Sequence, residues 1–113
     1  MYITDISNIM DVIKMMPPMV EGEIADADEY ATKALQTRAH FPEIAQTLYD
    51  LSLEEMGHMS RLHAAVADLI DKYRAEKGEP PAPMMAMYEY LHNQQIAKAA
   101  EAKALQETFK DNK

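Results

Sequence analysis

The sequence predicts an all-α protein. Apolar residues recur every three or four positions over stretches much longer than a strand, which is the period of an amphipathic helix. Only 3 glycines occur among the 113 residues, and no stretch carries a strand signal. The prolines lie at the ends of the periodic stretches, where helices start or stop. We therefore expect one helical domain over residues 1–113, with a short leading helix and three longer ones.

The leading helix is predicted within residues 1–16. An apolar stripe over residues 6–13 follows Asp5 or Ser7, and either side chain can cap a helix. The pair Pro17–Pro18 ends this helix, because proline disfavours helical geometry at the residue before it. Such a helix either caps the bundle or contacts a neighbouring subunit.

The second helix is predicted over residues 18–38, because the same prolines suit a first helical turn. Its inward positions are small or apolar with the exception of one carboxylate, Glu23. Ala27 and Ala34 are small enough to let another helix come close. The inward positions are Val20, Glu23, Ala27, Tyr30, Ala34 and Leu35.

The third helix is predicted from residue 43 to residue 77, with Pro42 before it and Gly78 as its stop. It forms an antiparallel pair with the second helix over residues 18–78. A proline-rich connector over 79–83 leads to a last helix over 84–110. One face of the third helix carries Leu48, Leu51, Glu55, His58, Leu62, Ala65 and Leu69.

That face is apolar except for Glu55 and His58, which lie one turn apart. Burying a carboxylate is costly unless a cation lies beside it, and an inward Glu-x-x-His pair is one way to hold iron or manganese. Glu23 would repel Glu55 unless a divalent cation bound between them. Without metal, both carboxyls should have raised pKa values. We predict Glu23, Glu55 and His58 as metal ligands and catalytic residues.

Other readings of these side chains stay open. His58 can instead be satisfied by a neighbouring glutamate in a metal-free polar patch. A second Glu-x-x-His match, Glu89 and His92, lies on a mixed surface and is expected to be solvated or at an interface. His63 is expected at the surface, and Tyr30 either packs in the core or bonds a ligand carboxylate. Three acidic residues are either solvated or form an outer site that admits iron: Glu21, Asp26 and Glu54.

Composition excludes several classes of protein. A net charge of −8 argues against binding nucleic acid and is compatible with attracting cations. The absence of cysteine leaves no disulfide framework, zinc knuckle or rubredoxin-type iron centre. No run approaches the roughly 20 apolar residues of a membrane span, and Met1–Asp5 does not begin like a signal peptide. We expect a cytoplasmic protein without membrane or nucleic-acid partners.

Glu23 with Tyr30 and Ala34, followed by the stretch from Tyr49 to His58, resembles the first half of rubrerythrin and related ferritin-like proteins. The resemblance covers about residues 20–70. In that superfamily the first long helix gives one glutamate and the second gives a Glu-x-x-His, which together bind iron. This chain has no clear second half, which makes it similar to the encapsulated ferritins, half-ferritins whose site forms between subunits. The resemblance implies a ferritin-like bundle completed by dimerisation.

The function that follows is iron binding with ferroxidase activity, in which oxygen or peroxide oxidises Fe(II). Two iron ions would be shared between two chains of a homodimer or a higher multiple, and manganese is a possible substitute. The alternative is a non-enzymatic helical assembly or interaction module. In that case the same side chains hold a structural metal or form a polar dimer seam.

Overall fold

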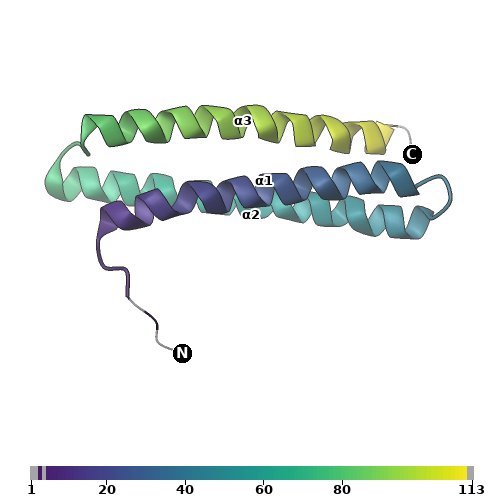
Figure 1. The fold of residues 1–113 in the computed structure, drawn as a ribbon, viewed down its shortest axis with the longest axis horizontal. Helices are drawn as coiled ribbons and strands as arrows, with labels where there is room; N and C mark the ends of the chain where they lie inside the picture. The colour runs from purple at the N-terminus through teal and green to yellow at the C-terminus, as the bar shows by residue number, and fades with distance from the viewer. Residues whose placement is uncertain (1–2, 4, 112–113) are drawn as a thin grey trace.

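Three helices, each antiparallel to the one before it, make up the computed structural model, which describes residue 3 and residues 5–111. They are α1 (Ile9–Thr37), α2 (Pro42–Lys77) and α3 (Ala82–Asp111). All three follow the 56 Å long axis of the molecule (Figure 1). No strand occurs among the described residues, so the all-α prediction is confirmed. In that part of the chain no helix has the length and apolar character needed to cross a membrane.

α1 runs without a break through Pro17–Pro18. The prediction of a short leading helix within 1–16 and a separate second helix over 18–38 is therefore wrong. The structure has one helix where the sequence suggests two. Residues 1, 2 and 4 of the predicted leading helix lie outside the described residues.

Packing explains why the prolines do not end α1. An interior proline removes a backbone donor and costs about 3 kcal/mol. Ile13 and Met16, which precede the prolines, are buried in one apolar cluster with Val66 and Ile70 of α2. Burying each such side chain contributes about 1.5–3 kcal/mol. Because Pro17 is itself buried, the apolar stripe continues across the proline pair and offsets its cost.

The start of α1 differs from the prediction, whereas both ends of α2 agree with it. α1 begins after Asn8, whose Oδ1 accepts a hydrogen bond of 2.8 Å from the Met10 backbone N–H, so neither Asp5 nor Ser7 is the cap. α2 starts at Pro42. It ends at Gly78, where φ is 83°, a left-handed conformation that glycine adopts without strain.

The buried side of α2 is rotated away from the predicted face. We call that predicted face the Glu55 stripe. It consists of Leu48, Leu51, Glu55, His58, Leu62, Ala65 and Leu69. None of these residues is fully buried, and His58 and Ala65 are exposed. The side of α2 that α1 and α3 cover consists of Ala45, Ser52, Met56, Met59, Val66 and Ile70. The Glu55 stripe therefore lies along the margin of the packed surface.

A buried serine joins all three helices beside the candidate ligands. The hydroxyl of Ser52 on α2 donates to the Ala27 carbonyl of α1 at 2.6 Å and accepts from Nε2 of Gln106 on α3 at 2.8 Å. Ala27 is fully buried, and its small side chain permits the close approach that the sequence predicts. This contact sets the register of α1 against α2 one turn from both Glu23 and Glu55.

Candidate metal centre

The helix pair α1 and α2 brings Glu23, Glu55 and His58 together. One donor atom from each residue lies within 4.8 Å of the other two. The Nδ1 atom of His58 lies 3.5 Å from Oε2 of Glu23 and 3.6 Å from Oε1 of Glu55. Within the described part of the chain, no other group of three His, Asp or Glu side chains converges in this way.

The separations fit donors that share one ion after a small contraction. Ligand atoms about 2.1 Å from a metal lie about 3.0–3.4 Å apart at right-angled to tetrahedral geometry. The two measured distances from His58 Nδ1 exceed this range by little. Carboxylate oxygens with an imidazole nitrogen suit Fe(II) and Mn(II). The donor set is therefore compatible with either ion.

The two carboxyls affect one another strongly. The pKa of Glu55 is raised from 4.5 to about 7 by a hydrogen bond with Glu23, by burial and by the negative charge of Glu23. His58 opposes the rise, and Asp26 adds to it. A proton therefore remains between the carboxyls near neutral pH, and a bound cation would take its place. The predicted rise in pKa is confirmed for Glu55.

The group is open on one side. The Glu55 side chain is 16% exposed, Glu23 28% and His58 53%. A groove of about 350 Å³ adjoins it, lined by Met19, Glu23, His58, Arg61 and Leu62. Sequence reasoning missed Met19 and Arg61. Each lies one turn from a predicted ligand, and this spacing is the signal that identifies them.

The prediction that His63 lies at the surface is wrong. His63 is half-buried, and its Nε2 lies 3.0 Å from Oε1 of Gln95 on α3. The Gln95 amide nitrogen donates to the Pro17 carbonyl at 3.3 Å, which turns Oε1 toward His63. The Nε2 atom of His63 therefore carries the hydrogen in this contact. The hydrogen bond between His63 and Gln95 links α2 to α3.

The second Glu-x-x-His pair stays apart from Glu23, Glu55 and His58. Glu89 is exposed. His92 packs against His63, with ring centroids 4.8 Å apart, and against Tyr88. Burial and the neighbouring His63 lower the pKa of His92. Glu89 is therefore solvated, whereas His92 packs between α2 and α3, and neither joins Glu23, Glu55 and His58.

The other candidate residues do not form a second site. Tyr30 is half-buried on α1, and no hydrogen bond joins it to Glu23, Glu55 or His58. Asp26 acts electrostatically on Glu55, whereas Glu54 is exposed on α2. Glu21 instead lines a groove on the α3 side of α1. These acidic residues therefore do not converge as one outer site.

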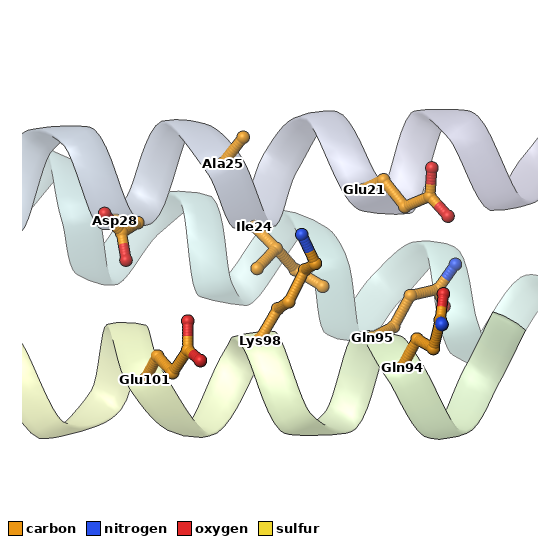
Figure 2. A pocket seen from close by; sticks show the side chains of 8 residues that line it. All are labelled: Glu21, Ile24, Ala25, Asp28, Gln94, Gln95, Lys98 and Glu101. Carbon is orange, nitrogen blue, oxygen red and sulfur yellow. The ribbon is translucent and has the colours of Figure 1, made fainter.

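The groove between α1 and α3 has a volume of about 540 Å³. Figure 2 shows Lys98 extending from α3 toward α1, between side chains that carry opposite charge. The acidic side chains that line it are Glu21, Asp28 and Glu101. This groove carries side chains of both charges and lies between α1 and α3, so it is separate from the group formed by Glu23, Glu55 and His58.

Comparisons of the chain with protein-family models, with curated proteins and with solved structures find no match. The likeness to ferritin-like proteins therefore depends on the residues described above.

Proposed function

We propose that this chain binds Fe(II) and promotes its oxidation at a two-iron carboxylate site shared between two copies. The observation that carries the proposal is the convergence of Glu23, Glu55 and His58 within 4.8 Å. The type and spacing of these three residues predict the same group from the sequence. Manganese is compatible with the same donors.

Two features of the surroundings support a cation at this point. The pKa of Glu55, raised to about 7, reflects two carboxyls competing for one positive charge. The formal net charge of the chain is −8, which favours the approach of cations. Metal binding would release the shared proton and relieve the repulsion.

A second copy of the chain completes the ligand set. One chain offers two carboxylates and one imidazole, whereas a di-iron carboxylate site in a helical bundle uses four carboxylates and two imidazoles. A two-fold axis beside the group supplies the missing half. The exposed His58 and the adjoining groove leave space for that copy.

The reaction needs no other redox group from the protein. Two Fe(II) ions together supply the two electrons that reduce oxygen to hydrogen peroxide, or peroxide to water. Glu23 and Glu55 would hold the ions and offset their charge, and His58 would add a nitrogen ligand.

Aerobic addition of Fe(II) tests the activity. We expect rapid growth of ferric absorbance, slowed at least about tenfold in Glu55→Ala and in His58→Ala. Glu89→Ala is the matched control, because Glu89 belongs to the other Glu-x-x-His match and is exposed. Equal rates in Glu55→Ala and the unaltered protein would contradict the proposal.

An anaerobic Fe(II) titration tests the sharing of the site. Saturation near one iron per chain is expected for two ions held between two chains. Saturation at two per chain would exclude the two-fold arrangement.

The second candidate function is a metal-free helical assembly. The raised pKa of Glu55 favours this second function, because a protonated Glu55 can bond to Glu23 without a metal ion. The two carboxyls then form a polar contact whose hydrogen bonds are satisfied. Metal-free dimers whose stability does not change on adding Fe(II) or Mn(II), together with slow ferric formation, would select this function over the first.

A further inference from the structure

The Glu55 stripe has the spacing of a coiled-coil seam. With Ile44 before it, the stripe steps alternately by four and three residues as far as Leu69. This spacing defines a heptad with Leu48, Glu55 and Leu62 at a positions and Leu51 and His58 at d positions. The side of α2 that packs within the chain lies next to this seam, which leaves Ile44 55% exposed and His58 53% exposed.

The seam is complementary to a reversed copy of itself. Antiparallel helices place a positions opposite d positions. When Glu55 faces the partner's His58, Leu51 faces the partner's Leu62 in the next layer. The outer layers then pair Leu48 with the partner's Ala65 and Ile44 with the partner's Leu69. Every apolar position therefore meets an apolar position, and each carboxylate meets an imidazole.

The charges beside the seam agree with the same register. The positions just before the a residues are exposed, and they include Glu54 and Arg61. Neither forms an ion pair with a described residue of its own chain. In an antiparallel pair these positions lie on one side of the seam, between the same two layers. Arg61 then lies opposite the partner's Glu54, and the contact occurs twice by symmetry.

A parallel pair would lose these matches. It places Glu55 against the partner's Glu55, and Arg61 beside the position that Val66 occupies. Val66 is buried within its own chain. The parallel arrangement therefore offers Arg61 no acidic partner and brings like charges together in the seam.

We propose that α2 pairs antiparallel with α2 of a second copy, with Arg61 of each chain bound to the partner's Glu54. The inference deepens the proposed function, because it takes the second copy from that function and specifies its orientation and register. It also assigns Arg61 as the residue that selects the antiparallel partner.

Charge reversal tests the ion pair in metal-free protein. Arg61→Glu and Glu54→Arg should each weaken dimerisation about tenfold or more, measured by sedimentation at low salt. The double variant Arg61→Glu/Glu54→Arg should regain the original dissociation constant within a few-fold. Lys98→Glu on α3 is the control for the same charge change and should leave dimerisation intact. Failure of the double variant to recover would overturn the register.

Cysteine cross-linking tests the orientation, and the chain has no native cysteine. Oxidising a mixture of Leu51→Cys and Leu62→Cys proteins should give the mixed disulfide dimer. Cross-linking of each variant with itself would indicate a parallel pair and overturn the proposal. A protein that is monomeric both without metal and with Mn(II) would also overturn it. If the double variant regains dimerisation but the unaltered protein does not oxidise Fe(II), the proposed function is overturned and the antiparallel pairing is not.

Discussion

The Nδ1 atom of His58 lies 3.5 Å from Oε2 of Glu23, on the neighbouring helix. The Nδ1 edge of the ring therefore faces both carboxyls, since the same atom lies 3.6 Å from Glu55. This orientation identifies Nδ1 as the donor atom that a metal ion between the helices would use.

Replacing His58 with a carboxamide should distinguish the two ring edges. The side-chain oxygen of His58→Asn can reach the place of Nδ1, whereas the longer His58→Gln carries its oxygen nearer the place of Nε2. We expect His58→Asn to retain more Mn(II) affinity than His58→Gln, by roughly tenfold. Isothermal titration measures the difference. The reverse order would assign Nε2 as the ligand.

Stability of the metal-free protein should fall as pH rises. The folded-state pKa of Glu55 is about 7, above its ordinary value of 4.5. The folded state therefore binds the proton more tightly, and this contribution is complete below pH 4.5 and lost as pH rises through 7. We expect a loss of about 1–2 kcal/mol, reduced by water in the adjoining groove.

Urea unfolding at pH 5 and pH 8 measures this loss. Glu55→Gln should remove most of the pH dependence, because its amide does not ionise. Glu89→Gln should retain it. A stability that rises between these pH values in the unaltered protein, after correction with Glu55→Gln, would contradict the shared proton.

Ser52→Ala should destabilise the fold by about 1–3 kcal/mol, because it leaves the buried Gln106 amide without its hydrogen-bond partner. It also removes the hydroxyl bond to the Ala27 carbonyl, which keeps its backbone bond within α1. Ser60→Ala is the matched control, since Ser60 is exposed on the same helix. Denaturant midpoints measure both variants. Equal midpoints would show that the serine contact contributes little.

Gly57→Ala should stabilise α2 by about 0.5–1 kcal/mol. A methyl group added at Gly57 would have no neighbouring atom within 4 Å, and the backbone there is helical. Gly22→Ala in α1 meets the same conditions and should have a similar effect. Unfolding measurements test both. A loss of stability only in Gly57→Ala, at concentrations where dimers form, would indicate an intermolecular contact away from the Glu55 stripe, because Gly57 lies at a c position of the heptad.

Much of the fold and the ligand group could be predicted because they depend on local signals. Gly78 and Pro42 mark the ends of α2 through backbone geometry alone. Glu23, Glu55 and His58 can be identified from the sequence, because polar or charged side chains on apolar stripes need a partner. Their convergence then follows from two long helices joined by a short turn.

The remaining features depend on tertiary packing. The sequence places a helix end at Pro17, but burial of Ile13 and Met16 against α2 carries α1 through it. His63 looks like a surface residue until α3 brings Gln95 against it. Similarly, periodicity does not reveal that α1 and α3 cover only one side of α2. The buried side of α2 includes Ser52, which bonds to both α1 and α3. A polar serine adds nothing to an apolar pattern, so the pattern does not identify that side.

The short turn between Thr37 and Pro42 has a consequence for how the protein forms. All three candidate ligands belong to the helical hairpin that precedes α3. Closing a loop of a few residues costs little chain entropy, and local contacts of this kind form early and fast. The three residues of the candidate ligand group therefore all precede α3 in the sequence. We expect a nascent chain to bring them together before α3 has been synthesised.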